Sequence, residues 1–289
     1  MNSPDLSRVV LITGCSSGIG AATALRLVQQ GWRVYATARS LDSLRGLEQA
    51  GCRILVLDVD SEASMQAAVA TITHEAGGVT ALVNNAGYSQ SGPVEMVSMA
   101  RVRRQFETNV FGLIRLTQLV LPGMRARRHG CIVNIGSMGG RLTFPGGGLY
   151  HATKHALEAL SDALRFEVAG FGIHVVLVQP GLIRTSFTQA ASTSLEGLGA
   201  GLAGPYGTFT AEVDRITRDT YVKGPIAALA GSPEDVAAVV QIALEAKAPR
   251  ARYRVGRSAT LFMTLRMLLP DRLWDRVLAR TYPRPGQRD

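Results

Sequence analysis

The stretch Arg8-Val9-Val10-Leu11-Ile12-Thr13-Gly14-Cys15-Ser16-Ser17-Gly18-Ile19-Gly20 determines the fold class. Its first half is apolar and β-branched, which is typical of a strand buried in a parallel sheet. A turn of small residues follows with the spacing G-x-x-x-G-x-G, and an Ala- and Leu-rich helical pattern continues to about residue 30. Small residues between a strand and a helix let the backbone approach a pyrophosphate at the positive helix end. The unit indicates a dinucleotide site, although its spacing departs from G-x-G-x-x-G and a turn without a ligand is the alternative.

Strand and helix patterns alternate along the rest of the chain. Further strands are expected at residues 33–37, 53–57, 81–83, 131–135, 173–178 and 252–256. Six alternations predict an α/β fold, a doubly wound parallel sheet of about seven strands in a single Rossmann-type domain with helices on both faces. Ligands of such sheets bind at the carboxyl ends of the strands. We expect one domain over residues 1–289, since no repeat or low-complexity linker divides it.

Composition limits the function classes. The chain has 289 residues, 46% of them hydrophobic, and a formal net charge of +9. The excess is almost all arginine scattered along the chain, without a basic run among aromatics, so no nucleic-acid partner is expected. Cys15, Cys52 and Cys131 have no metal-ligand spacing, so we expect no metal and a reducing compartment. The N-terminus lacks a signal-peptide layout, and residues 110–124 fall short of the roughly 20 that a membrane span requires. A cytoplasmic location is predicted.

Residues after the second and third expected strands suggest which dinucleotide binds. A free ribose calls for an acidic residue near the second strand end, whereas a 2′-phosphate calls for an arginine. Arg39 follows that strand, so NADP is favoured. Asp42 fits better in the first turn of the next helix, with Ser40 as its cap. Asp58 either accepts a hydrogen bond from adenine or caps the following helix.

Two more polar groups stand out before the catalytic candidates. Asn84-Asn85-Ala86-Gly87 closes the fourth strand and forms a wall toward the cofactor, although such turns are also common without ligands. Asn109 lies within a long helical pattern at residues 98–128, where asparagine is unfavourable. A buried Asn109 would hold a water or bend the helix; an exposed one would do neither.

Tyr150 and Lys154 lie four residues apart at the start of an expected helix, so their side chains share a face. An ammonium beside a phenol favours the phenolate and lowers a pKa that is ordinarily about 10. This would make Tyr150 a general acid or base, although such a pair often marks an ordinary helix face.

Residues 186–231 break the alternation and are rich in Gly, Ala and Leu with interspersed aromatics, which favours a substrate lid over a disordered linker. Ser232-Pro233-Glu234-Asp235 is a strong helix start. Residues 257–282 form an apolar and basic helical extension interrupted at Pro270, which would pack on the lid, meet another subunit or lie on a membrane surface. Packing is the expected case, and membrane contact is not.

These motifs resemble those of the classical short-chain dehydrogenase/reductase family, closely over residues 8–185 and in layout beyond. The matching stretches are residues 13–20, Asp58-Val59, Asn84-Asn85-Ala86-Gly87, Asn109, Ser137, Tyr150 with Lys154, and Pro180-Gly181 with Thr185. The Gly-Cys-Ser-Ser-Gly turn, residues 35–39 and the C-terminal extension look like the branch that holds 17β-hydroxysteroid and retinol dehydrogenases.

The resemblance implies roles for individual residues. Tyr150 would donate the proton, Lys154 would lower its pKa and bind the nicotinamide ribose, and Ser137 would stabilise the substrate carbonyl. Asn109 would complete a water-linked proton relay. The implied cofactor-binding residues are Gly14, Ser16, Ser17, Gly18, Ile19, Arg39, Asp58, Val59, Asn85, Ala86, Gly87, Tyr150, Lys154, Pro180, Gly181, Ile183 and Thr185. A homodimer or homotetramer is also implied.

We therefore expect an NADP(H)-dependent oxidoreductase that interconverts a carbonyl and an alcohol on a medium-sized, mainly apolar small-molecule substrate. The expected apolar lining is Leu142, Phe144, Phe187, Leu195, Leu198, Tyr206 and Phe209. One alternative is a non-catalytic NADP-sensing protein of the same fold, which would not need Ser137, Tyr150 and Lys154 together. Another is the extended branch with epimerase or dehydratase activity, whose glycine spacing is tighter.

Overall fold

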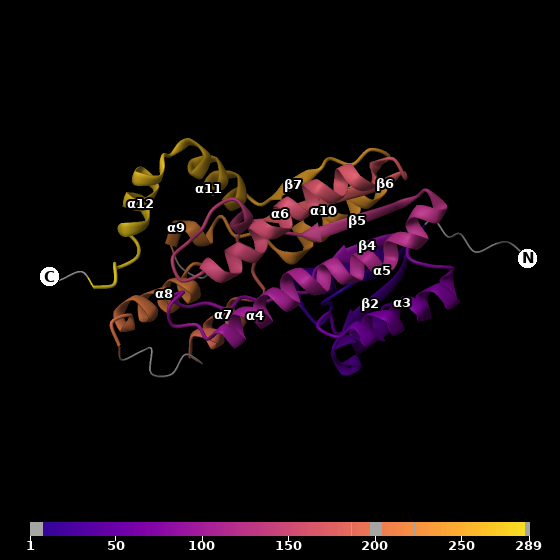
Figure 1. Cartoon of the computed structure of the whole chain (residues 1–289), viewed down its shortest axis with the longest axis horizontal. Helices are drawn as coiled ribbons and strands as arrows, with labels where there is room; N and C mark the ends of the chain where they lie inside the picture. The colour runs from indigo at the N-terminus through magenta and orange to yellow at the C-terminus, as the bar shows by residue number, and fades with distance from the viewer. Residues whose placement is uncertain (1–7, 186, 197–203, 222–223, 287–289) are drawn as a thin grey trace, which may run out of the picture.

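The structure is a computed structural model, and it describes residues 8–185, 187–196, 204–221 and 224–286 (Figure 1). Its centre is a seven-stranded sheet in the order β3-β2-β1-β4-β5-β6-β7, and every neighbouring pair is parallel. The strands are β1 (Val9–Ile12), β2 (Arg33–Ala38), β3 (Arg53–Val56), β4 (Ala81–Asn84), β5 (Gly130–Ile135), β6 (Ile173–Pro180) and β7 (Arg252–Val255). The strand order reverses between β1 and β4, which confirms the predicted doubly wound sheet in a single domain.

Helices cover both faces of the sheet. In chain order they are α1 (Gly18–Gln29), η2 (Leu41–Leu44), α2 (Arg45–Gln49), α3 (Glu62–Ala76), α4 (Met99–Phe106), η3 (Glu107–Phe111), α5 (Gly112–Arg127), η4 (Met138–Gly140), α6 (Gly148–Ala169), α7 (Phe187–Glu196), α8 (Gly207–Asp219), α9 (Gly224–Ala227), α10 (Pro233–Glu245), α11 (Arg257–Leu268) and α12 (Asp271–Ala279).

The alternation of side chains along the strands produces two cores. Val10 and Ile12 of β1 pack with α1, α2 and α10, whereas Val9 and Leu11 pack with α3, α5 and α6. Successive side chains of a strand point to opposite faces, so an unbroken apolar strand needs a cover on each side. The three-layer arrangement follows directly from the apolar runs in the sequence.

The predicted long helix at residues 98–128 is divided into three parts. Asn109 lies in η3, a turn of π-helix between α4 and α5. Its side chain is buried and bonded to groups outside the helix, which explains the irregularity. Asn109 thus disturbs the helix, as one of the two readings predicted.

Two other expectations need correction. Residues 186–231 were expected as a long loop, but their described part contains α7, α8 and α9. Ser40 precedes η2 without a side-chain capping bond. By contrast, Ser232 and Asp235 form a complete capping box at α10, and the C-terminal extension is broken at Pro270 as expected. Leu198 and the side chain of Phe187 lie outside the described residues.

Figure 1 shows α7, α8, α9, α11 and α12 gathered at the end of the molecule opposite the N-terminus. This is the end to which the carboxyl ends of the strands point, because each strand leads away from the N-terminal side. These five helices therefore lie at the edge of the sheet where a ligand site is expected, whereas α10 covers a face and β7 extends the sheet.

Candidate active site

The predicted site residues all lie at or just beyond the carboxyl ends of the strands, or on η3 and α6. At the end of β1, Gly14 (φ +70°) and Gly18 (φ +58°) adopt left-handed backbone conformations that favour glycine. A Cβ on Gly20 would lie 2.3 Å from the carbonyl oxygen of Gly14, so the first turn of α1 packs directly on the preceding loop. The glycines thus allow the backbone of α1, of the turn and of the loop after β4 to approach one another closely.

The start of α1 presents its backbone amides without a neutralising side chain. Ser17 precedes the helix but makes no side-chain capping bond, and the first turn carries no acidic residue. Ser16 and Ser17 are exposed at the tip of the turn, and Ile19 packs on the core below it. Free amides at a helix N-terminus favour a phosphate-like anion.

The end of β4 holds the glycine turn in place. Asn85 donates through Nδ2 to the carbonyl oxygens of Thr13 (2.9 Å) and Gly14 (3.0 Å). The backbone amides of Asn85 and Ala86 both donate to Oγ1 of Thr13 at 3.0 Å. Asn85, predicted to contact a cofactor, therefore positions the turn that would do so.

The three residues that were considered for recognition of the adenosine half of the cofactor lie after β2 and β3. Arg39 is exposed just after β2. Asp42 is held by Arg45 at 2.7 Å in the first turn of η2, where it was expected. Asp58 accepts a bond from the amide of Asp60 at 3.1 Å, and Ser61 rather than Asp58 caps α3. Neighbouring Val59 is buried in the core, and its carbonyl oxygen packs on Gly112 of α5.

Ser137 and Tyr150 meet where β5 and α6 converge. Ser137 follows β5 and precedes η4, and it accepts a bond from the amide of Gly139 at 3.0 Å, which fixes its side chain. Burial raises the pKa of Tyr150 above its usual value, while a side-chain hydrogen bond with Ser137 lowers it by less, and nearby Tyr221 adds to the rise. The net direction leaves the phenol protonated at neutral pH.

Lys154 lies beside Tyr150 on α6 and is only 7% exposed. Its Nζ donates to the carbonyl oxygen of Ile135 at 2.8 Å and lies 5.7 Å from the centre of the Tyr150 ring. Burial lowers the pKa of Lys154 to about 8. The ammonium is directed at a backbone carbonyl in this arrangement, and the predicted lowering of the Tyr150 pKa by Lys154 stays a prediction.

Asn109 joins three segments around this pair. Its Oδ1 accepts from the amide of Tyr88 at 3.0 Å, and its Nδ2 donates to the carbonyl oxygen of Tyr88 (2.9 Å) and to Oγ1 of Thr153 (3.2 Å). Gly87 packs against it, with a hypothetical Cβ 3.1 Å from Oδ1. Both amide hydrogens are thus in use, so the side chain holds the residue before Lys154.

Sequence reasoning missed His151, which neighbours Tyr150. Its Nδ1 accepts from the amide of Phe144 at 3.3 Å, and its ring lies so close to Gly139 and Gly147 that a Cβ there would come within 2.4 and 2.7 Å. Burial lowers the pKa of His151 to about 4, so the ring is neutral near pH 7. The signal available in the sequence was the pair of glycines that precede it, Gly139 and Gly147.

A buried chain of polar side chains was also missed. Asn84 of β4 donates to Asn134 of β5 at 3.0 Å and to Thr117 of α5 at 3.2 Å. Asn134 in turn donates to Ser161 of α6 at 3.0 Å. Buried amides of this kind must be fully paired, and here they fix the register of the strands that carry the site.

The loop after β6 is braced from two sides. A Cβ on Gly181 would lie 2.3 Å from Oγ of Ser258, and that oxygen accepts from the amide of Leu182 at 2.9 Å. Ile183 forms a parallel bridge with Gly231. Thr185 lies against the glycine turn, 3.2 Å from a hypothetical Cβ on Gly18. The residues from Pro180 to Thr185 therefore border the same space as the start of α1.

Two apolar clusters lie next to the catalytic candidates. Leu142 and Phe144 belong to the first, which also contains Met138, Leu182, Met263 and Trp274. Leu195, Tyr206 and Phe209 belong to the second, with Val213 and Tyr282. The expected lining is thus divided between the two, and Val213 of α8 packs on Gly146 in the loop before Tyr150.

The segment after β6 is attached to the loop after β4. The amide of Ser91 donates to Oγ of Ser194 at 2.9 Å, and Arg101 donates to the carbonyl oxygen of Ser194 at 3.3 Å. Tyr206 donates to Glu95 at 2.5 Å. These bonds attach α7 and the start of α8 to the loop after β4 and to α4.

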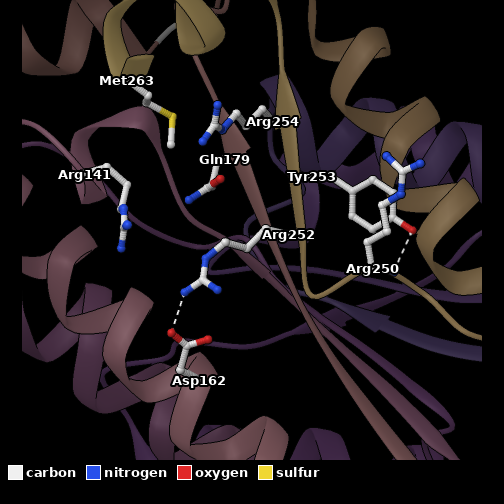
Figure 2. A pocket seen from close by; sticks show the side chains of 8 residues that line it. All are labelled: Arg141, Asp162, Gln179, Arg250, Arg252, Tyr253, Arg254 and Met263. Atoms are coloured by element: carbon white, nitrogen blue, oxygen red, sulfur yellow. Dashed lines mark hydrogen bonds and ion pairs between the residues drawn. The ribbon is translucent and has the colours of Figure 1, made fainter. Parts of the chain in front are cut away.

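A separate cavity of about 570 Å³ lies at the β7 edge and contains none of the catalytic candidates (Figure 2). It is lined by Arg141, Asp162, Gln179, Arg250, Arg252, Tyr253, Arg254 and Met263. Figure 2 shows Arg252 directed at Asp162, to which it is bound at 2.6 Å, and Arg252 also reaches Glu158 at 3.0 Å. This ion-pair network connects α6 to β7 behind the site.

The residues that the structure describes contain no group of three or more His, Cys, Asp and Glu arranged to hold a metal ion. Among the described helices, none combines the length and apolar character that crossing a membrane requires.

The fold and the site define a dinucleotide-dependent oxidoreductase. The chain belongs to the short-chain dehydrogenase/reductase family, because residues 8–196 match the family model described as short chain dehydrogenase. This confirms the predicted resemblance. The family uses a nicotinamide dinucleotide, NAD or NADP, on small-molecule substrates.

Two curated relatives carry an assigned activity. The 3-ketodihydrosphingosine reductase of Bacteroides thetaiotaomicron is 42% identical over 187 residues, 65% of this chain and 68% of the relative. The NADPH-dependent 3-dehydrocapnine reductase of Ornithobacterium rhinotracheale is 33% identical over 93% of this chain and 95% of the relative. A short-chain dehydrogenase from Streptomyces avermitilis has a similar structure, with a TM-score of 0.73 and 32% identity over 96% of this chain and 95% of that one.

Proposed function

We propose that the chain is an NADP(H)-dependent oxidoreductase that interconverts a ketone or aldehyde and the corresponding alcohol on a medium-sized, mainly apolar substrate. The observation that carries the proposal is the hydrogen-bonded pair of Ser137 and Tyr150 beside buried Lys154, next to an apolar cluster. A protonated phenol and a fixed hydroxyl are the groups that a carbonyl oxygen needs as it gains charge.

The residues at the strand ends fit a dinucleotide. Because Gly14 and Gly20 have no side chain, the glycine turn packs closely on α1 and on the end of β4. The start of α1 then offers its backbone amides to a pyrophosphate. Exposed Arg39 suits a 2′-phosphate, and no acidic residue between it and the glycine turn competes for a ribose. The relative from Ornithobacterium is named as NADPH-dependent, which supports NADP over NAD. When bound, NADPH supplies a hydride.

The chain's own groups handle the proton and the developing charge. Ser137 would hold the substrate oxygen, and Tyr150, whose phenol is protonated near pH 7, would give it a proton in the direction of reduction. Lys154 would bind the nicotinamide ribose and, once turned from Ile135, favour the phenolate that remains. Asn109 would position the segment before Lys154 and contribute to a water-linked relay.

Substrate preference follows from the apolar surroundings. Residues 186–231 would act as a lid over the site, and residues 257–282 would close its outer wall, within one domain. The clusters around Leu142 and Phe209 favour an aliphatic or polycyclic body. The two named relatives reduce ketones whose names indicate long-chain lipids, which supports an amphiphilic ketone for this chain. A homodimer or homotetramer and a cytoplasmic location remain predictions.

The test is NADPH consumption by the purified chain across ketones and aldehydes of increasing chain length, with the product alcohol identified by mass spectrometry. We expect activity that rises with chain length and falls when NADH replaces NADPH. Tight NADPH binding without turnover of any carbonyl would favour the alternative, an NADP-sensing protein of the same fold.

A further inference from the structure

The last two helices, α11 and α12, lie beyond the part of the chain that matches the family model. Their inner sides are core: Ala259, Met263 and Trp274 are buried in the apolar cluster that contains Met138 and Leu142. Figure 1 shows the two helices as a bent pair at the outer end of the molecule, beside the C-terminus. We call this pair, residues 257–279, the C-terminal elbow.

The outer side of the elbow is unusually apolar. Five of the fifteen exposed large hydrophobic residues in the described part of the chain belong to it, within a span of 17 residues. Met267 and Leu268, at the bend, are 72% and 69% exposed, and Leu261, Leu273 and Val277 are also exposed. Single exposed apolar side chains are ordinary, but a cluster of this kind marks a surface for interaction.

The charges of α12 are sorted by helical spacing. Arg272, Arg276 and Arg280 are exposed and follow one another at four-residue intervals, so they form one row. Leu273 and Val277 form the adjacent row, between the arginines and the buried face that holds Trp274. An apolar stripe beside a cationic stripe is the pattern of a helix that lies in a membrane interface.

The acidic residues are kept away from this side. Residues 257–270 contain no Asp or Glu, and Arg257 is exposed at the start of α11. Asp271 and Asp275 share the opposite side of α12, and Asp271 is paired with Arg266 at 2.6 Å. The acidic group nearest the apolar bend, Asp271, is thus paired with Arg266, and the exposed Arg257, Arg272 and Arg276 leave an excess of cations that complements an anionic surface.

We propose that the C-terminal elbow docks on the surface of an anionic lipid bilayer. Met267 and Leu268 enter the boundary between headgroups and acyl chains, and the row of Arg272, Arg276 and Arg280 contacts lipid phosphates. A second copy of this chain is a poorer occupant, because a two-fold contact would bring identical arginine rows toward each other. The docking is interfacial, since no described helix has the properties of a membrane span.

The C-terminal elbow lies next to the candidate active site, so docking would bring that site to the bilayer. This step rests on the proposed function. The inner face of the same helices belongs to the apolar cluster next to Ser137 and Tyr150. A docked enzyme would therefore receive its substrate along a short apolar path. The substrate class that fits is a long-chain ketone dissolved in the bilayer, rather than a ketone free in water.

Flotation of the full chain with vesicles tests the proposal. At low salt, we expect the chain to float with vesicles of phosphatidylglycerol and phosphatidylcholine but not with phosphatidylcholine alone, and to dissociate as salt rises. Met267→Glu/Leu268→Glu should abolish flotation. Arg272→Gln/Arg276→Gln should lower partitioning by about thirtyfold, from the usual contribution of each basic residue near an anionic surface.

Ile242→Glu is the matched control, because Ile242 is 57% exposed on α10, outside the elbow, and should float like the parent. Circular dichroism checks that each variant folds. Failure of the parent to float at low salt, or flotation of Met267→Glu/Leu268→Glu at the parent level, would overturn the proposal. So would a change from oligomer to monomer in that variant without vesicles, since the elbow would then be a contact between copies.

A Tyr150→Phe chain separates this proposal from the proposed function. It should float as the parent does even though it lacks the proton donor. Conversely, Met267→Glu/Leu268→Glu should keep its activity on a short water-soluble ketone and lose activity only on a ketone held in vesicles. If it loses both equally, the elbow supports the fold and does not deliver substrate.

Discussion

Lys154 lies beside the ring of Tyr150, with Nζ 5.7 Å from the ring centre, yet it donates its 2.8 Å hydrogen bond to the carbonyl oxygen of Ile135. The ammonium thus lies beside the phenol ring while it binds a backbone carbonyl. Tyr150 is hydrogen-bonded to Ser137, and burial raises the pKa of its phenol. The site as described holds Tyr150 in its protonated form.

Lys154→Met should shift the pH dependence of alcohol oxidation toward higher pH. Oxidation begins from the phenolate, and the variant loses the ammonium that would stabilise it. The pH profile of kcat/KM for oxidation, compared with that of the parent, measures the shift. A lower rate with an unchanged profile would show that Lys154 acts only through binding and position.

Arg39→Ala should weaken NADPH binding by about tenfold or more and leave NADH binding nearly unchanged, because a charge-assisted contact to the 2′-phosphate is lost. Dissociation constants of NADPH and NADH, obtained by fluorescence titration, measure the two effects. Arg45→Ala is the matched control, since Arg45 is exposed nearby but already bound to Asp42. Equal weakening of both cofactors would assign the 2′-phosphate to another residue.

Gly20→Ala should reduce cofactor affinity and stability together. The added methyl would lie 2.3 Å from the carbonyl oxygen of Gly14, so α1 must move away from the turn. Gly46→Ala in α2 has open space around it and should be neutral or slightly stabilising. Thermal unfolding with and without NADPH compares the two variants, and equal behaviour would contradict the close packing described here.

Asn109→Ala should destabilise the fold by about 1–3 kcal/mol, since the Tyr88 amide loses its acceptor and the Tyr88 carbonyl keeps only the bond from Gln105. Thr153→Val removes only the third contact of Asn109 and should cost less. Denaturant unfolding of both variants provides the comparison. A smaller loss for Asn109→Ala than for Thr153→Val would show that the Tyr88 bonds contribute little.

The low pKa of His151 should make the stability of the fold depend on pH. Burial lowers its pKa from 6.5 to about 4, so between these values the unfolded chain binds the extra proton and the folded chain does not. Stability should fall as pH drops from about 6.5 toward 4, by roughly 2 kcal/mol from this group. In His151→Asn, which keeps an acceptor for the Phe144 amide, that part of the slope should disappear. An unchanged slope would assign the acid sensitivity to the carboxylates.

The strands and the glycine turn could be predicted from the sequence because local signals agree there: apolar runs such as residues 9–12 need cover on both faces, and Gly14 and Gly18 need left-handed backbone. The resemblance added Ser137, Tyr150 and Lys154 as a set. What the sequence could not supply depends on contacts between distant segments. Arg252 binds Glu158, which is 94 residues away, and the helices within residues 186–231 form on a glycine-rich stretch because Leu195, Phe209 and Val213 pack together.

Asp58 illustrates the same limit at a single position. Two roles were open for its carboxylate, and the structure excludes capping because Ser61 takes that role. The spacing of Asp58 and Ser61 permits either residue to cap the helix. Only the observed backbone course selects between them.

The most direct measurement of the central claim compares the single-turnover rate of ketone reduction in the parent, Tyr150→Phe and Tyr221→Phe, each saturated with NADPH. Tyr221 is the control because it is a nearby tyrosine that affects Tyr150 electrostatically without a proposed bond to substrate. We predict that Tyr150→Phe binds NADPH like the parent but reduces the ketone at least about a hundredfold more slowly, while Tyr221→Phe stays within a few-fold of the parent. A Tyr150→Phe rate equal to that of the parent would contradict the account.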